Sequence, residues 1–200
     1  MIRDFKSKFD NNEFDDNFIK DEVGIDHDFL NVDKLEDICE KIVNTISKYQ
    51  WHQHTFISAD DVINYEYQKS PADTLKNTSQ DKIIMDSLHR SIGKYVKTVG
   101  SEYYGSWEGY TAVKYMRYKV GNLMEKHADH IHSVFQNDYG IPKGIPILSC
   151  IGVLNDDYEG GEIEMFEDTK IDLEPGEVLI FPSVFLYPHK VCEITKGTRY

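Results

Sequence analysis

The chain has 200 residues, of which 40% are hydrophobic and 28% charged, and its formal net charge is −13. This composition is typical of one ordinary globular domain, and no apolar run approaches the roughly 18 to 20 residues that a membrane span requires. The negative charge argues against a surface for duplex nucleic acid, because such a surface needs clustered cations.

The beginning of the chain and its cysteines predict a cytoplasmic protein. Charged residues follow Met1 closely, without an apolar segment behind them, so no signal peptide is expected. Cys39, Cys150 and Cys192 form an odd set without CxxC spacing, and each lies in an apolar run. Reduced, buried thiols are therefore predicted.

The acidic charge is concentrated near the N-terminus. Residues 1–40 carry 13 acidic and 5 basic side chains. Within them, residues 1–29 mix Asp and Asn with Phe side chains, among them Phe5, Phe9, Phe14 and Phe18, and show no clean period. We expect an acidic N-terminal arm that packs its Phe side chains on the body of the protein, with a partner-binding segment as the alternative.

Two amphipathic helices are predicted in the first half of the chain. Apolar residues recur at three- and four-residue steps over residues 35–49, with Asp33 as the expected N-cap. The same pattern covers residues 84–99 and is opened by Ser79. Between them, residues 65–80 are polar, include a proline and lack periodicity, which predicts a long loop of the kind that is usually functional or disordered.

From Thr111 onward the patterns predict β-strands. "YTAVKYMRYKV" is rich in aromatic and β-branched residues, and "IPILSCIGVLN" and "EVLIFP" are short apolar runs. "GGEIEMF" alternates apolar with acidic side chains, and turns rich in Gly, Pro, Asn and Asp separate the runs. Several short strands at regular spacing indicate an antiparallel sandwich or barrel. The two helices are expected to back this β core, which makes the predicted fold α+β.

Residues 126–133, "KHADHIHS", place four potential metal ligands close together. As a strand, the segment would direct His127 and Asp129 to one face. His130 and His132 would then point to the other face, either exposed or behind the ligands. A helix would instead pair His127 with His130. The β pattern upstream favours the strand.

The end of the chain supplies a third ligand and a cation. "YPHKVCEITKGTRY" places His189 just after an apolar strand and Arg199 ten residues beyond it. With His127 and Asp129, His189 completes a set of two histidines and one carboxylate. Such a facial triad suits non-haem Fe(II) and leaves three coordination positions open. A nearby guanidinium can hold a distant carboxylate in a bidentate grip.

Several ordered motifs accompany these residues: "RYKVG" before the first ligand, "VLNDDYEGGEIEMF" in the middle, and "LEPGEVLIFPS" before the distal histidine. From "KYMRYKVGNLMEKHADH" to "GTRY", the sequence resembles the 2-oxoglutarate- and Fe(II)-dependent oxygenases, in particular their prolyl-4-hydroxylase-like branch. The resemblance implies a double-stranded β-helix (jelly roll) formed by the C-terminal half and backed by the N-terminal helices. We therefore expect a single domain over residues 1–200, with the arm at 1–29, the helices and loop at 30–110 and the jelly roll at 111–200.

The resemblance also implies roles for individual residues. It assigns His127, Asp129 and His189 to iron. It assigns Arg199 to the 5-carboxylate of 2-oxoglutarate, with Tyr118 helping through its hydroxyl. Fe(II) is the implied cofactor, 2-oxoglutarate the cosubstrate, and ascorbate a further cofactor that the family suggests. The implied reaction hydroxylates a C–H bond, foremost that of a peptidyl proline, and releases succinate and carbon dioxide.

The sequence departs from the family at three points. Animal oxygen-sensing prolyl hydroxylases have tyrosines where this chain has Met124 and Val153, so polar contacts to 2-oxoglutarate are expected to differ. The sequence also ends one residue past Arg199, whereas family members continue with a final strand. A trimmed sequence and an arginine on a frayed end are the two explanations.

Three functions remain open. The first is hydroxylation of a peptidyl proline or a similar protein side chain, with a protein or peptide as the partner. The second is the same chemistry on a free amino acid, another metabolite or a nucleobase. The third is a jelly-roll module that only holds a divalent metal, against which Arg199 and Tyr118 argue. The acidic charge disfavours nucleic acid and predicts a preference for basic or neutral peptides.

Roles are also expected for residues 65–80 and for the pair His52 and His54. In related enzymes a flexible segment before the jelly roll folds over the peptide, and residues 65–80 are expected to form such a lid, with Tyr65 and Tyr67 as contacts. His52 and His54 share an i, i+2 spacing without a carboxylate, and we expect them to be surface or structural residues.

Overall fold

The computed structural model describes most of the chain between residues 23 and 200. The described residues are 23–30, 38–54, 56–57, 62–63, 72–99, 109–129, 135–136, 142–166 and 169–200. They form two helices and sixteen short strands. No helix within these ranges is both long and apolar enough to cross a lipid bilayer.

Helix α3 (Ile38–Ile46) lies inside the region whose apolar period predicts it. Its inward face buries Ile42 and Ile46 completely. The expected N-cap, Asp33, lies outside the described residues.

Helix α4 (Asp81–Val99) also lies where it is predicted, but its N-cap is Thr78 rather than Ser79. The backbone N–H of Gln80 donates to Thr78 Oγ1 (3.1 Å), and the backbone N–H of Thr78 donates to Asp81 Oδ1 (3.2 Å). The Thr78 and Asp81 side chains thus accept hydrogen bonds from backbone N–H groups at the start of the helix, in the manner of a capping box.

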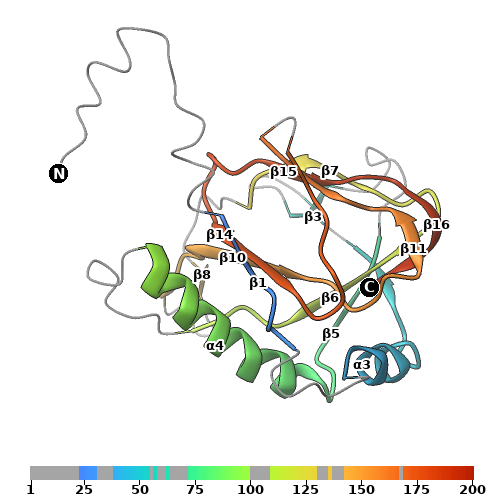
Figure 1. Cartoon of the computed structure of the whole chain (residues 1–200), viewed down its shortest axis with the longest axis horizontal. Helices are drawn as coiled ribbons and strands as arrows, with labels where there is room; N and C mark the ends of the chain where they lie inside the picture. Colours follow the sequence, from blue (N-terminus) through green and yellow to red (C-terminus); the bar gives the residue numbers. More distant parts are fainter. Residues whose placement is uncertain are drawn as a thin grey trace, which may run out of the picture.

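Strand β14 (Val178–Pro182) organises the core because it is buried on both faces. Val178 and Ile180 pack in the cluster that includes the helices, whereas Leu179 and Phe181 belong to a second cluster on the other side. Burial on both faces explains why this strand reads as an unbroken apolar run. Its antiparallel neighbours are β1 (Gly24–Asp26) and β10 (Leu148–Gly152). Helix α4 covers the outer face of this sheet (Figure 1).

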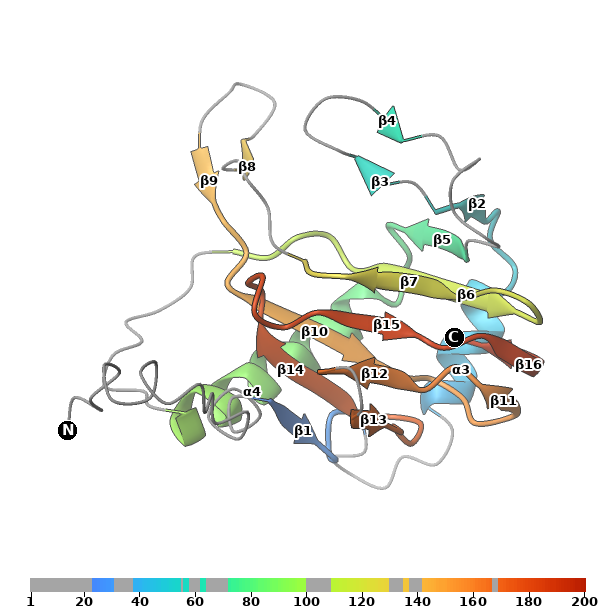
Figure 2. The same cartoon turned by 90° about the horizontal axis from the view of Figure 1, so that it is seen from above.

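A four-stranded sheet lies opposite β14. Its strands, in spatial order, are β13 (Thr169–Ile171), β12 (Ile163–Met165), β15 (His189–Val191) and β7 (Met124–His127). Ile163 and Met165 share the second cluster with Leu179 and Phe181, so the two sheets enclose one apolar layer. Seen from above, β7 and β15 run alongside each other (Figure 2).

A third sheet carries strands from both halves of the chain. Its strands, in spatial order, are β11 (Tyr158–Gly160), β16 (Ile194–Arg199), β6 (Lys114–Lys119), β5 (Asp73–Lys76) and β2 (His52–Gln53). Along β6, Tyr115 packs with the helices, while Tyr118 packs with Met124 and Val191. Two short pairs complete the described strands: β3 (Phe56–Ile57) with β4 (Val62–Ile63), and β8 (Phe135–Gln136) with β9 (Pro142–Gly144).

The layers confirm an α+β fold in which facing antiparallel sheets are backed by helices. The prediction of a loop over residues 65–80 is wrong for residues 73–76, which form β5. "DTLK" has one apolar side chain, Leu75, and is a strand because its backbone pairs with β6. A lid over this part is therefore excluded, and Tyr65 and Tyr67 lie outside the described residues. Strands β1, β2 and β5 also precede residue 111, so the sheets extend beyond the expected core at 111–200.

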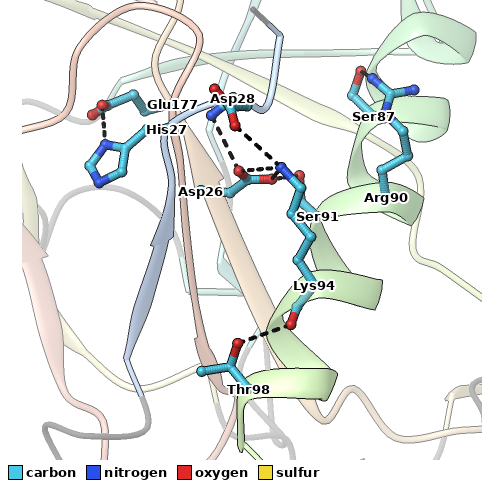
Figure 3. Close-up of polar contacts among 9 residues, drawn as sticks. All are labelled: Asp26, His27, Asp28, Ser87, Arg90, Ser91, Lys94, Thr98 and Glu177. Atoms are coloured by element: carbon cyan, nitrogen blue, oxygen red, sulfur yellow. Dashed lines mark hydrogen bonds and ion pairs between the residues drawn. The ribbon is translucent and has the colours of Figure 1, made fainter. Parts of the chain in front are cut away.

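A polar network fastens β1 and the residues after it to α4 and β14 (Figure 3). Ser91 Oγ donates to Asp26 Oδ2 (2.6 Å), and Lys94 Nζ forms an ion pair with Asp26 Oδ1 (2.9 Å). Burial acts to raise the pKa of Asp26, but these two partners outweigh it and the pKa is lowered. On the other side of β1, the ring of His27 contacts the carboxylate of Glu177.

Candidate metal centre and cosubstrate site

Three side chains with metal-ligating atoms converge at one end of β7 and β15. One ligand atom each of His127, Asp129 and His189 lies within 4.8 Å of the other two. His127 Nε2 is 3.4 Å from Asp129 Oδ1, and His189 Nε2 is 3.8 Å from Asp129 Oδ2. These are the three residues that the sequence predicts as iron ligands.

Strand pairing places the two imidazoles side by side. His127 ends β7 and His189 begins β15, and the two residues are Cα partners in the antiparallel register. Their ring centroids are 4.5 Å apart. Phe181 on β14 lies edge-on to His189 at 5.0 Å, so an apolar floor supports the second imidazole. The strand interpretation of "KHADHIHS" holds as far as His127, after which the strand ends.

Backbone carbonyls orient both imidazoles. His127 Nδ1 lies 2.8 Å from the Glu125 carbonyl oxygen, and His189 Nδ1 lies 3.1 Å from the Tyr187 carbonyl oxygen. Because a carbonyl only accepts, each Nδ1 must carry the proton and donate it. The Nε2 atoms, which face Asp129, are then left with the lone pair that a metal requires.

The Asp129 carboxylate is held in its charged form. Burial by itself would raise its pKa, but a hydrogen bond from the protonated form of His127, the hydrogen bond from Ser149 and the charge of nearby His189 lower it to about 2. The strongest fixed contact is with Ser149 on β10, whose hydroxyl donates to Asp129 Oδ2 at 2.6 Å. Ser149 is a site residue that the predicted set of ligands does not include.

The pKa values of the two histidines shift in opposite directions. For His127, burial acts to lower the pKa, but Asp129 and the Glu125 carbonyl outweigh it and the pKa is raised. For His189, burial dominates and the pKa is lowered in spite of Asp129. His189 is 3% exposed and Asp129 35%, so the cluster opens to solvent on the Asp129 side.

Arg199 and Tyr118 form a buried pair beside this cluster. They are Cα partners between β16 and β6, and Arg199 Cζ lies 5.5 Å from the centroid of the Tyr118 ring. This is within the range of a cation–π contact. Burial raises the pKa of Tyr118 to about 12, although the Arg199 charge opposes the shift. The hydroxyl therefore stays protonated and able to donate.

The guanidinium of Arg199 is not fully satisfied by the protein. The side chain is buried, and its Nε has no hydrogen-bond partner among the described residues. A buried donor left unpaired costs about 1–3 kcal/mol, which an anionic ligand would recover. Space beside it depends on Gly161, because a Cβ there would lie 3.1 Å from Arg199 Cδ. The backbone of Arg199 is paired with β6 and its side chain is buried, so Arg199 does not lie on a frayed end of the chain.

The remaining sequence expectations have mixed outcomes. His52 is exposed, as expected of a surface residue, while His54 is buried. Met124 and Val153, which replace family tyrosines, are both buried in apolar clusters. His130 and His132 lie outside the described residues. The cysteines are reduced, as predicted, but partly rather than fully buried.

The residues fit Fe(II) and 2-oxoglutarate. Two imidazoles and one carboxylate are the donor set that suits non-haem Fe(II), and three protein ligands leave the other coordination positions of the metal for further ligands. The unsatisfied Arg199 Nε offers a buried donor for a carboxylate.

Comparison with known proteins agrees with this chemistry. Residues 113–200 match the model of the 2OG-Fe(II) oxygenase superfamily. This stretch contains all five predicted site residues. No curated protein sequence matches the chain.

Solved structures of prolyl hydroxylases share the fold. A viral collagen prolyl hydroxylase from Paramecium Bursaria Chlorella virus-1, in complex with 2OG, is 16% identical and has a TM-score of 0.58, with coverage of 89% of this chain and 91% of that one. A Pseudomonas putida prolyl-4-hydroxylase is 12% identical with a TM-score of 0.62, covering 92% and 91%. A Trichoplax adhaerens prolyl hydroxylase, in complex with a hypoxia inducible factor peptide fragment, is 16% identical with a TM-score of 0.63, covering 92% and 84%.

The structural likeness covers nearly the whole chain, including the helices that back the jelly roll. The family match covers the C-terminal part and indicates its chemistry. Residues 113–200 match the 2OG-Fe(II) oxygenase superfamily, which identifies the chain as a 2-oxoglutarate-dependent dioxygenase that uses Fe(II), and the chain has the fold of the prolyl hydroxylases.

Proposed function

We propose that this enzyme hydroxylates a peptidyl proline, with succinate and carbon dioxide as co-products, and that His127, Asp129 and His189 hold its iron. The observation that carries the site assignment is the convergence of the three ligand atoms within 4.8 Å, at the end of two paired strands. The whole chain, 1–200, would act as one oxygenase domain.

The protein's first task is to hold the metal without filling its coordination sphere. The Glu125 and Tyr187 carbonyls keep the two imidazoles in the tautomer that presents Nε2. Ser149 holds the third ligand, Asp129, in a fixed orientation. A metal held from one side by three fixed ligands keeps its other positions for cosubstrate and dioxygen.

The second task is to bind 2-oxoglutarate in one orientation. Arg199 would hold its 5-carboxylate, and the Tyr118 hydroxyl would donate to the same group. Because both residues are buried, water is kept from the ion pair, which strengthens it. When bound, Fe(II) and 2-oxoglutarate supply the oxidation: one oxygen atom of O₂ enters succinate, carbon dioxide leaves, and the other atom becomes the substrate's hydroxyl.

Three prolyl hydroxylases of like fold support proline as the target, and one of them is bound to a peptide fragment. The buried, partly unpaired Arg199 argues against a module that only holds a metal, since such a module has no use for a buried cation of this kind. A peptide or protein is therefore the proposed substrate.

The proposal is tested by turnover on a peptide panel. Purified protein with Fe(II), 2-oxoglutarate and ascorbate should form succinate, and proline-containing peptides should gain one oxygen atom by mass spectrometry. Alanine-for-proline versions of the same peptides should not gain it. Oxygen found only on free amino acids or on nucleosides would replace this proposal with the corresponding metabolite or base oxygenase.

Two matched histidine variants test the metal assignment. His127→Ala should lose divalent-metal binding, measured by calorimetry. His52→Ala, which removes an exposed histidine on β2, should bind the metal as the unmodified protein does. Equal metal affinity in both variants would remove His127 from the site.

A further inference from the structure

Two lysines face each other beside the candidate iron site. Lys76 on β5 and Lys114 on β6 are direct Cα partners in the antiparallel register. Like charges placed opposite each other in this way destabilise a sheet. The repulsion is felt at Lys114, where burial, followed by the charge of Lys76, lowers the pKa.

Neither lysine is neutralised by an ion pair with a described residue, in a chain whose net charge is −13. Six other described lysines do have such partners: Lys82, Lys94, Lys119, Lys170, Lys190 and Lys196. Lys41, Lys48 and Lys97 also lack an ion pair with a described residue, but none of them is paired with a second lysine across two strands. An acidic protein that leaves two adjacent cations unpaired concentrates positive potential at one place.

That place adjoins the iron site. Side chains alternate along β6, so Lys114 shares a face with Met116 and Tyr118, and Tyr118 is stacked under Arg199. The Asp129 carboxylate is near enough to act on the pKa of Lys114 by its charge, although no ion pair joins the two. Lys114 keeps contact with solvent, while neighbouring atoms partly desolvate its ammonium.

His54, which directly follows β2, borders the same region. Its backbone N–H donates to the Ala72 carbonyl (2.9 Å), and its side chain is buried. Burial, followed by the charges of Lys114 and His127, lowers its pKa to about 4. The imidazole is therefore neutral at ordinary pH, and the positive charge here belongs to the two lysines.

The cosubstrate does not account for these cations. In the proposed function, the distal carboxylate of 2-oxoglutarate belongs to Arg199 and its other end to the metal. We propose that Lys76 and Lys114 form an anion subsite at the mouth of the iron site, which binds a carboxylate of the substrate. This inference rests on the proposed function, and it names the substrate class: one with a negative charge near the carbon to be hydroxylated.

A bound carboxylate would convert a repulsive pair into two attractive contacts. The subsite would favour acidic peptides, whereas the net charge of the protein favours basic or neutral ones. Long-range repulsion then lowers the association rate of an acidic peptide, while the contact with the two lysines lowers its dissociation rate. The carboxylate could be an acidic side chain of a peptide or the α-carboxylate of a free amino acid.

The test measures binding without turnover. Fluorescence anisotropy is recorded under nitrogen, with Fe(II) and 2-oxoglutarate present, for labelled peptides that contain one proline. Each position near the proline carries Glu, Gln or Lys in turn. At one position at least, the Glu peptide should bind about tenfold more tightly than the Gln peptide, and the Lys peptide more weakly.

Charge variants locate the effect. The double variant Lys76→Met, Lys114→Met should lose the Glu preference, and Lys114→Glu should invert it in favour of Lys. Lys97→Met, an exposed lysine on α4, is the matched control and should keep the preference. A Glu preference that survives in the double variant, or is absent at every position, overturns the subsite.

Two further arms separate the subsite from the proposed function. If no peptide is hydroxylated and the alanine-for-proline peptides keep the Glu preference, the subsite is supported and the prolyl reaction is rejected. If peptides are hydroxylated but show no charge preference in binding, the prolyl reaction is supported and the subsite is rejected. Free L-proline that binds to the unmodified protein, and not to the double variant, would identify the carboxylate as that of a free amino acid.

Discussion

Replacing Ser149 with Ala should weaken metal binding although Ser149 is not itself a proposed ligand. The substitution removes the hydroxyl that donates to Asp129 Oδ2 at 2.6 Å and leaves the strand backbone of β10 in place. Asp129 would then lose the contact that selects one orientation of its carboxylate. Groups that orient a ligand in this way typically contribute 10- to 100-fold to metal affinity.

The structure narrows this range. A hydrogen bond to a charged group contributes about 1.5–3 kcal/mol when it is buried. Asp129 is 35% exposed, so water replaces part of the lost contact and the lower half of the range applies. The expected loss is about 1.5–2 kcal/mol, which corresponds to roughly 10- to 30-fold in the dissociation constant.

The assay is a calorimetric titration with Mn(II), which avoids oxidation of Fe(II). The matched control is Ser91→Ala, since Ser91 donates to Asp26 Oδ2 at the same distance of 2.6 Å but lies on α4. That variant should lower the melting temperature and leave metal affinity unchanged. If Ser149→Ala binds Mn(II) as tightly as the unmodified protein, or if both variants lose affinity equally, Ser149 does not orient Asp129 for the metal.

Arg199→Ala should weaken 2-oxoglutarate binding by on the order of 2 to 5 kcal/mol, because a buried ion pair is lost, while metal binding persists; unchanged affinity in a calorimetric titration would remove Arg199 from the site. Gly161→Ala should weaken the same binding, since a Cβ at a φ of +76° would lie 2.4 Å from Ile194 Cδ1 and 3.1 Å from Arg199 Cδ; a variant with intact affinity would show that the arginine has room to move. A hydrogen bond to Glu177 and the charge of Glu177 raise the pKa of His27. The contact therefore stabilises the folded protein fully below the ordinary His pKa of about 6.5, and this stabilisation is lost as pH rises through the raised pKa. Urea unfolding between about pH 6 and about pH 9 should therefore show a fall in stability that His27→Ala reduces, and identical profiles would contradict this.

The parts of the site that follow local rules could be predicted from the sequence. His127 and Asp129 share a side because alternation along a strand and its extension depends only on neighbouring residues. That His189 lies opposite them depends on the pairing of β7 with β15, which no local pattern encodes. For His189 and Arg199, their order and spacing after an apolar strand supplied the link, and the resemblance to a family strengthened it.

The strand form of β5 and the burial of His54 do not follow from the local sequence pattern, whereas the role of Ser149 has a local signal. Strand β5 has a single apolar side chain, so its strand form depends on backbone pairing with β6 rather than on its own composition. His54 is buried by tertiary packing, whereas its i, i+2 spacing from His52 indicated nothing about burial. Ser149 did carry a signal, because a hydroxyl within the apolar run "LSCIG" needs a hydrogen-bond partner.

The place of β1 has a consequence for the synthesis of this protein. His27 contacts Glu177 across 150 residues of sequence, and β1 pairs with β14 over a similar separation. At ordinary translation rates the segment around β1 would wait roughly 10 to 30 seconds on the ribosome before its partner strand is made. The helices can form early, but the sheets close only when the last quarter of the chain appears, and contacts between such distant segments make folding slow. During that interval β1 is an unpaired strand. Asp26 at its end and Asp28 two residues beyond would help to keep nascent chains from associating through it.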